Sequence, residues 1–123
     1  LFLWISLCDL IFYTNHRLLH SRQLFFIHKK HHEFNFTYGA GAIYAHPLDF
    51  VFANIFPISV PFIIFNIPFT QCILITFFSS FFTVVISHGG YFKNQSHLIH
   101  HRKKMGNYGL LYTDRLFNTY LAN

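Results

Sequence analysis

The sequence predicts an all-α integral membrane protein, in which a transmembrane helical hairpin carries a histidine-rich helical cap that faces the cytosol and holds a dinuclear metal site. Hydrophobic residues make up 53% of the 123 residues and charged residues only 11%, against about 25% charged residues in an average soluble domain. No charged residue lies between Asp49 and Lys93. Eight of the ten histidines fall into three clusters with the spacing of metal ligands, and His88 lies between the second and third clusters. The whole chain, 1–123, is expected to form one domain.

The formal net charge of +5 comes from basic residues that lie in the same polar stretches as the histidines or soon after them. They are Arg17, Arg22, Lys29, Lys30, Lys93, Arg102, Lys103, Lys104 and Arg115. They form no separate basic stripe, which argues against nucleic-acid binding. By the positive-inside rule, these stretches face the cytosol. Cys8 and Cys72 stand in apolar runs without a CxxC pair and are expected to be reduced.

Residues 1–13 are apolar apart from Ser6 and Asp9, but they are too few to span a bilayer, which takes about 20 residues. The chain opens inside this run without Met, so we expect it to be a fragment whose amino-terminal spans are missing. His16 and His20 follow at i and i+4, on one face of the same helix. Asp9, about two turns earlier, either accepts the second ring N–H of a ligand histidine or is a helix-end acid in solvent; the sequence leaves both open.

Residues 21–33 are predicted to continue the helix, with His28, His31 and His32 at i, i+3 and i+4 on one side. His31 and His32 are neighbours and point roughly 100° apart, so they can serve different metals, or one can support the other. Residues 35–47 resemble a loop. His46, before a proline, is isolated and is more often a structural hydrogen-bonding group than a ligand. Asp49 is expected to cap the next helix.

Residues 50–67 and 69–87 are each near the length of a membrane span and are divided by Pro68. Pro57 and Pro61 fall inside the first segment, where proline is tolerated but kinks the helix. A hairpin returns His88 to the side of the first clusters. One tilted span with a re-entrant segment would place the clusters on opposite faces, where they could not share a metal site. The histidine pattern therefore favours the hairpin.

The remainder of the chain repeats the pattern of the first half. Glycines follow His88, as suits a left-handed helix stop, and His97, His100 and His101 again stand at i, i+3 and i+4. Residues 102–104 are basic and are expected to contact lipid headgroups. Residues 106–109 predict a turn, and residues 110–120 a short closing segment. In that segment the Asp114–Arg115 pair is expected to fix the tail against the histidines.

The number of histidines distinguishes between kinds of metal site. Their regular spacing over separated segments excludes a purification tag. A structural zinc site takes four ligands and usually includes cysteine, whereas nine imidazoles suffice for two ions at four or five ligands each. Imidazole suits iron, copper, zinc and nickel. A redox-active iron pair fits the setting, since it can turn dioxygen into an oxidant strong enough for an unactivated C–H bond of a lipid.

The candidate ligands are His16, His20, His28, His31, His32, His88, His97, His100 and His101. The candidate supporting or structural residues are Asp9, His46, Asp49 and Asp114.

The three histidine clusters resemble those of a known superfamily. Residues 16–20, 28–32 and 97–101 are similar to the HxxxH, HxxHH and HxxHH boxes of the fatty acid hydroxylase and sterol desaturase superfamily, and the likeness runs from about Asp9 to Tyr120. The connecting pieces most resemble the C-5 sterol desaturases (lathosterol oxidases). Those pieces are His46-Pro47-Leu48-Asp49, the proline-bearing hairpin, His88-Gly89-Gly90-Tyr91-Phe92, Asn107-Tyr108-Gly109 and Asp114-Arg115-Leu116-Phe117.

Two positions refine this resemblance. The C-4 methylsterol oxidases share Tyr44-Ala45-His46-Pro47, but they and the fatty acid hydroxylases tend to have a second histidine where this chain has Phe92. Phe92 thus favours the desaturases. Asn118 departs from the glycine common near that place.

The resemblance implies two iron ions (with zinc possible in a resting or purified form) in the endoplasmic reticulum membrane. It implies a lipid substrate, dioxygen as oxidant, and electrons from cytochrome b5 and its NADH-dependent reductase. The implied reaction removes two hydrogens from C-5 and C-6 of a sterol. The basic surface at Lys29, Lys30 and residues 102–104 would suit an acidic electron donor or lipid headgroups.

Three hypotheses stay open at this point. They are sterol C-5(6) desaturation, hydroxylation of a C-4 methylsterol or fatty acyl chain, and a non-catalytic membrane protein that keeps a structural metal site. The mass of the product separates the first two, and bound metal without turnover would indicate the third.

Overall fold

The computed structural model describes residues 2–89, 95–110 and 112–122, and all regular structure within these ranges is helical. The α-helices are α1 (Phe2–Leu19), α2 (Phe25–His28), α3 (Pro47–Asp49), α4 (Phe56–Ile64), α5 (Phe69–Phe81), α6 (Gln95–Lys103) and α7 (Thr113–Leu116). Two 3₁₀ turns, η1 (His31–Glu33) and η2 (Gly39–Ile43), and two π-helical turns, η3 (Phe50–Ile55) and η4 (Phe82–Ser87), lie between them. The all-α prediction is confirmed.

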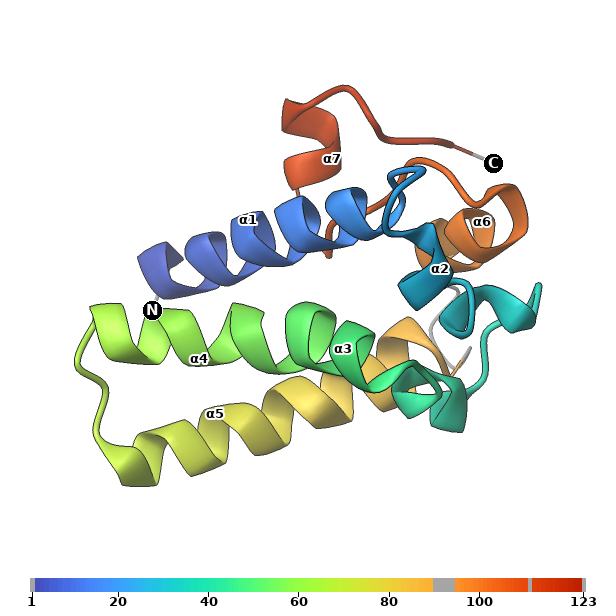
Figure 1. Cartoon of the computed structure of the whole chain (residues 1–123). Helices are drawn as coiled ribbons and strands as arrows, with labels where there is room; N and C mark the ends of the chain where they lie inside the picture. Colours follow the sequence, from blue (N-terminus) through green and yellow to red (C-terminus); the bar gives the residue numbers. More distant parts are fainter. Residues whose placement is uncertain (1, 90–94, 111, 123) are drawn as a thin grey trace.

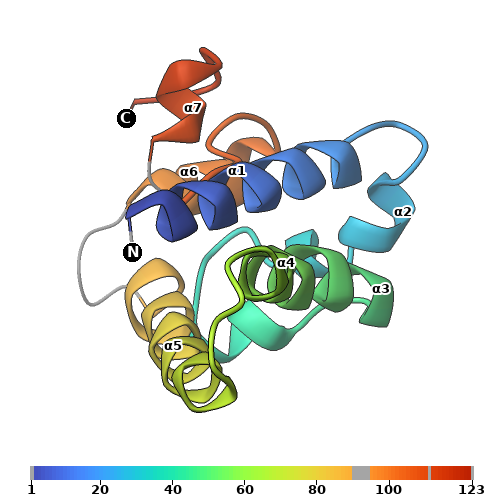
Figure 2. The ribbon, with the colours of Figure 1, turned by 90° about the vertical axis from the view of Figure 1, so that its left-hand side faces the viewer.

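The helices α1, α4 and α5 run lengthwise through the molecule, with the turn between α4 and α5 at one end and α2 and α6 at the other (Figure 1). In a view turned by 90°, α4 and α5 are seen nearly end-on, α1 crosses next to α4, and α5 stands apart from both (Figure 2). The hairpin returns His88 to the first histidine clusters, since the Nε2 atoms of His88 and His97 are 2.9 Å apart and His31 belongs to the same group. The predicted hairpin is confirmed, and the re-entrant alternative is wrong.

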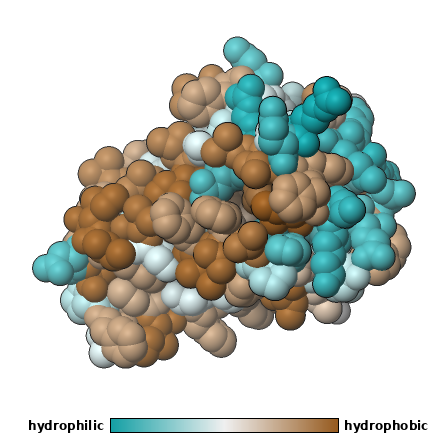
Figure 3. Space-filling model, in the orientation of Figure 1, coloured by the Kyte–Doolittle hydropathy of each residue, from teal (hydrophilic) through white to brown (hydrophobic). Residues whose placement is uncertain are grey.

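Two helical segments, Pro47–Ile64 and Phe69–Ser87, are long and apolar enough to cross a membrane. No residue of α5 is buried, and its Ile73, Phe77 and Phe78 side chains are more than half exposed. Apolar surface covers the end of the molecule that contains the hairpin turn, and polar surface gathers at the opposite end (Figure 3). This division suits helices whose outer surface meets lipid and whose cap meets water.

The π-helical turn η3 follows from the proline after it. The N–H of Phe56 donates to the carbonyl of Val51, five residues back. The carbonyl of Phe52 would pair with residue 57 in the same register, but Pro57 has no N–H. Asn15 of α1 donates its side-chain amide to this carbonyl instead, at 2.8 Å. The bond joins α1 to the first span one residue before His16.

The predicted continuous helix over residues 21–33 is wrong. Helix α1 ends at Leu19, the chain turns through Ser21, and only the four residues of α2 and the three of η1 are helical. A straight continuation would carry the second cluster away from the first, whereas the turn folds it back. The buried Leu19 and Ile27 pack with Ala53 at this corner.

The segment after α6 is held by carboxylates and an amide rather than by an apolar core. Residues 106–110 and 112–121, here called the C-terminal strap, lie across α1 (Figure 1). Asp9 accepts the backbone N–H groups of Leu110, Tyr112 and Thr113 at 2.8–3.2 Å. It is therefore neither a solvent-exposed acid, being 1% exposed, nor the partner of His16, whose Nδ1 bonds elsewhere.

Asp114 accepts the N–H groups of Tyr108 and Gly109 at 2.8 and 2.6 Å, so it fixes the strap as expected. Arg115, the other half of the predicted pair, lies over the ring of Tyr120 instead. Asn118 has a φ of 55°, the left-handed region that glycine and asparagine occupy most readily. This explains how asparagine replaces a glycine there.

Two smaller predictions have different outcomes. Both cysteines are free, as expected. Gly89 does not have the left-handed backbone of a helix stop, because Gly106 is the one glycine with positive φ among the described residues. A Cβ at Gly89 would lie 2.3 Å from the carbonyl oxygen of Val85, so glycine is needed there for close approach. Gly90 and Phe92 lie outside the described residues.

Candidate metal centre

Nine histidines form two groups at the polar end of the molecule, and within each group the possible ligand atoms lie within 4.8 Å of one another. The five-histidine group consists of His16, His20, His28, His32 and His100. The four-histidine group consists of His31, His88, His97 and His101. Each group is large enough to hold one metal ion.

Adjacent histidines belong to different groups. The rings of His31 and His32 are inclined at 82° and those of His100 and His101 at 89°. His31 and His101 point into the four-histidine group, whereas His32 and His100 point into the five-histidine group. Each HxxHH segment thus supplies both groups, because neighbouring side chains leave a helical backbone in divergent directions. This is the first of the alternatives that the sequence left open for His31 and His32.

Partners outside the five-histidine group fix the orientation of three of its rings. His16 donates from Nδ1 to the carbonyl of Tyr108 at 2.7 Å, and His100 donates to the carbonyl of Gly106 at 2.6 Å. His28 Nδ1 bonds to the carboxylate of Asp49 at 2.8 Å. Carboxylates and carbonyls commonly hold metal-binding histidines in this way.

The four-histidine group is held by backbone carbonyls. His31 donates from Nδ1 to Tyr44 at 3.3 Å, and His101 donates to Phe34 at 3.2 Å. His88 uses the π-helical turn η4: its backbone N–H and its Nδ1–H both donate to the carbonyl of Thr83, at 3.1 and 3.2 Å. The five-residue register of that turn therefore aims His88 at its group.

These partners leave the inner nitrogens of the rings facing one another. A ring that donates from Nδ1 to a carbonyl has a lone pair on Nε2 when neutral. The Nε2 atoms of His16 and His28 are 3.0 Å apart in the five-histidine group, and those of His88 and His97 are 2.9 Å apart in the four-histidine group. Converging lone pairs repel one another unless a cation lies between them. The donor set therefore fits a metal ion in each group.

Burial keeps the rings of His16, His20, His88 and His97 neutral, as metal binding requires. Loss of solvent, followed by repulsion from neighbouring histidines, lowers the pKa of His16 and His97 well below the usual 6.5. Burial lowers the pKa of His20 to about 3 and that of His88 to about 4. The rings are thus available as ligands at neutral pH.

The four supporting candidates have distinct positions. Asp49, buried, meets His28 as described, and its predicted helix-capping role falls to His46, whose ring nitrogen accepts the N–H of Leu48 at 3.2 Å. His46 belongs to neither histidine group. Asp9 and Asp114 hold the C-terminal strap, which brings the Tyr108 carbonyl to His16. Side-chain chemistry alone could not identify Phe34, Tyr44, Thr83, Gly106 and Tyr108 as partners, because each acts through its backbone carbonyl.

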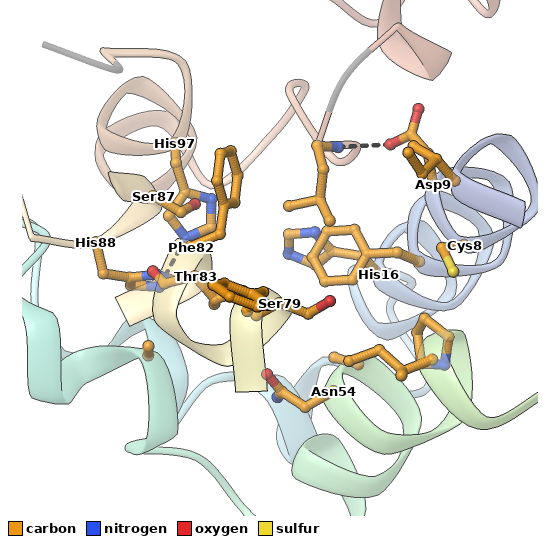
Figure 4. A pocket seen from close by; sticks show the side chains of 18 of the residues that line it. Cys8, Asp9, His16, Asn54, Ser79, Phe82, Thr83, Ser87, His88 and His97 are labelled. Carbon is orange, nitrogen blue, oxygen red and sulfur yellow. Dashed lines mark hydrogen bonds between the residues drawn. The ribbon is translucent and has the colours of Figure 1, made fainter. Parts of the chain in front are cut away.

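A cavity of about 460 Å³ runs from the histidines between α1, α4 and α5. It touches His16 and His28 of the five-histidine group and His31, His88 and His97 of the four-histidine group. Figure 4 shows His88 and His97 at the left of this space and His16, which extends from α1, at its right, with Asn54, Ser79 and Thr83 also lining it. Most of the remaining wall is apolar. A ligand in the cavity would be in reach of both groups.

Basic side chains cover the outside of the cap. Lys29, Lys30, Arg102, Lys103 and Lys104 are exposed, close in sequence to histidines of both groups. Lys93 lies outside the described residues. This surface is positive and faces away from the apolar half (Figure 3).

Comparison with known proteins gives a consistent result. The family model described as fatty acid hydroxylase matches residues 1–119. The human "fatty acid hydroxylase domain-containing protein 2" is 33% identical over 84% of this chain and 32% of its own length. Methylsterol monooxygenase 1 of Danio rerio is 33% identical over 87% of this chain and 42% of its own length.

A very-long-chain aldehyde decarbonylase of Oryza sativa is 31% identical over 90% of this chain and 48% of its own length. The chain spans less than half the length of each of these relatives. No solved structure matches.

Proposed function

The chain belongs to the fatty acid hydroxylase family, and we propose that it forms the di-iron centre of a membrane enzyme that oxidises a lipid with dioxygen. The observation that carries the proposal is the division of nine histidines into two groups at the end of an apolar cavity. One ion in each group would have four or five nitrogen ligands.

Bound iron would supply the redox chemistry that activates dioxygen toward a C–H bond. The chain's own residues supply the rest. Asp49 and the carbonyls of Tyr108, Gly106, Tyr44, Phe34 and Thr83 orient the rings. The apolar wall of the cavity holds a hydrocarbon and excludes water from the histidines.

The two apolar segments and the exposed α5 support the proposed membrane setting. In this arrangement the histidine cap faces the cytosol, on the positive-inside rule. The endoplasmic reticulum is the membrane that the sequence resemblance implies. The exposed lysines and arginines of the cap suit an acidic electron donor such as cytochrome b5, which its NADH-dependent reductase would reduce.

For the reaction, we propose removal of two hydrogens across C-5 and C-6 of a sterol, on the strength of the connecting segments that resemble C-5 sterol desaturases. A second candidate is hydroxylation of a C-4 methylsterol or a fatty acyl chain. The relatives whose names contain methylsterol monooxygenase and fatty acid hydroxylase favour it. Either reaction uses the same metal centre and cavity.

The test is expression of the longest reading frame that carries this chain in a yeast strain without its own C-5 sterol desaturase. Sterols and fatty acids are then read by mass spectrometry. Loss of two hydrogens from a sterol supports desaturation, and gain of one oxygen supports hydroxylation. His31→Ala should abolish either product. Two bound metal ions with no lipid product from any sterol or acyl precursor would refute both and indicate a structural site.

A further inference from the structure

Polar side chains interrupt the apolar wall of the cavity inside the two spans. Asn54 comes from η3 on the first span, and Ser79 and Thr83 come from the second span. In Figure 4, Asn54 and Ser79 extend from different helices into the same space. Polar groups at membrane depth are costly unless they have partners, so they commonly mark functional sites.

The hydroxyl of Ser79 lines the cavity and is not bonded within its own helix, in contrast to three other hydroxyl groups of the long helical segments. Ser6, Thr14 and Thr83 each donate to the carbonyl four residues earlier, at 2.8–2.9 Å. The hydroxyl of Ser79 has no hydrogen-bond partner within the described residues, although its backbone carbonyl accepts from Thr83. The Ser79 hydroxyl is therefore available to a ligand in the cavity.

Asn54 differs from Asn15 in the same way. The amide of Asn15 is used to join α1 to η3, but the amide of Asn54 has no partner among the residues that the structure describes. Asn54 also lines a second, smaller hollow of about 190 Å³, together with Thr83. It can donate and accept hydrogen bonds at once.

The two side chains lie at different depths below the histidines. Asn54 follows Asp49, the partner of His28, by five residues, and Ser79 precedes His88 by nine. At 1.5 Å per residue, these separations are roughly 7 and 13 Å along the spans. If a polar atom of a lipid were bound there, the carbon skeleton of that lipid would lie between the polar atom and the histidine groups.

We infer that Asn54 and Ser79 form a polar subsite that binds the oxygen of a lipid alcohol, whose hydrocarbon skeleton fills the cavity and reaches the histidine groups. The subsite specifies the substrate class of the proposed function. Its part in a reaction rests on that function, whereas its binding of an alcohol does not. A pure hydrocarbon would leave both groups unpaired in an apolar wall, so it should bind more weakly.

Trp4 permits a direct measurement of binding, because it is the chain's single tryptophan and lines the cavity. The protein in lipid nanodiscs, loaded with zinc so that no turnover occurs, is titrated while Trp4 fluorescence is followed. The probes are two matched pairs: cholestanol with cholestane, and hexadecanol with hexadecane. At least one alcohol should bind about five-fold or more tightly than its hydrocarbon.

The test variant combines Asn54→Leu and Ser79→Ala in one chain. The control variant is Ser80→Ala. Ser80 neighbours Ser79 but lines only the smaller hollow. The double variant should lower the alcohol-to-hydrocarbon ratio to about one, and Ser80→Ala should leave it unchanged. If the double variant does not fold, Ser79→Ala alone should lower the ratio.

A ratio of one for both pairs in the unaltered protein, or a ratio that the variants do not change, overturns the subsite. The probe pair that gives the higher ratio also shows whether the cavity accepts a rigid ring skeleton or a straight chain. If the protein oxidises a lipid but has an alcohol-to-hydrocarbon affinity ratio of one, the proposed function stands and the subsite is refuted. If the ratio is high but the iron-loaded protein oxidises no lipid, the subsite stands and the proposed function is refuted.

Discussion

The two histidine groups are built from the same sequence boxes but are supported differently. The five-histidine group is held by the carboxylate of Asp49 and by two carbonyls near the start of the C-terminal strap. The four-histidine group is held by carbonyls of the 34–44 segment and of the π-helical turn η4. A carboxylate raises the basicity of a ligand histidine more than a carbonyl does. Because the supports differ, substitutions can alter one histidine group without the other.

The largest expected effect comes from removing one ligand in each group. His32→Ala should leave about one bound ion per chain, and so should His97→Ala, but each should lose a different ion. Lipid oxidation should be abolished in both variants, because the proposed chemistry needs both ions. Metal content by plasma emission spectrometry and product by mass spectrometry measure the two effects. Loss of both ions from either single variant would contradict the separation into two groups.

The next largest effect tests the π-helical turn. Deleting Val85 should convert η4 to an α-helical register, which rotates His88 by roughly 100° away from its group. Metal content should fall from two ions to about one, with the five-histidine group still loaded. Thr83→Val is the control, because it keeps the carbonyl that accepts from His88. Two retained ions in the deletion variant would show that η4 does not position His88.

Acidification tests both groups in the metal-free protein. The folded pKa values of His20 and His88 are about 3 and 4, below the 6.5 of an exposed ring. The unfolded chain therefore binds more protons between these values. Stability should be highest above pH 6.5 and should fall as the pH drops from 6.5 toward 3. Circular dichroism across this range measures it, and a stability that rises on acidification would contradict the burial of neutral rings.

The sequence predicted the hairpin and the set of clustered histidines because both depend on local patterns. A long apolar run without charges and an i, i+3, i+4 spacing are visible in the residue order. The turn after Leu19 was missed, because residues 21–33 carry no proline or glycine to interrupt a helix. What breaks the helix there is the tertiary requirement that His28 and His32 face His16.

The partners of the rings could not be predicted for a different reason. Tyr108 and Gly106 contribute carbonyls, which every residue has, and they reach the histidines only through a strap held by Asp9 and Asp114. Helical spacing offered Asp9 as a partner of a ligand histidine, but this buried side chain accepts the backbone N–H groups of Leu110, Tyr112 and Thr113 instead. Helical spacing is informative within one helix and says little about contacts across more than a hundred residues.

Asp49→Asn sharpens the contrast between the supports. The amide keeps the shape of the side chain but removes the negative charge that faces His28. The metal affinity of the five-histidine group should fall by about 10- to 100-fold, with the four-histidine group unchanged. Competition with a chelator, monitored for each ion, measures this. The control is Glu33→Gln, at an exposed carboxylate outside both groups, which should alter neither affinity. If Asp49→Asn lowered the metal affinity of both groups equally, the two groups would be coupled.

The smallest effect concerns the contact between α1 and the first span. Asn15→Ala leaves the carbonyl of Phe52 unpaired, since Pro57 offers it no N–H. The free energy of unfolding should fall by about 1–3 kcal/mol, measured by denaturant titration in detergent. Thr14→Ala is the matched control, because the hydroxyl of Thr14 bonds only within α1. Since Asn15 adjoins His16, Asn15→Ala should also lower the metal affinity of the five-histidine group and leave that of the four-histidine group unchanged. If only the metal affinity of the four-histidine group fell, the register of α1 against η3 would not determine where His16 lies.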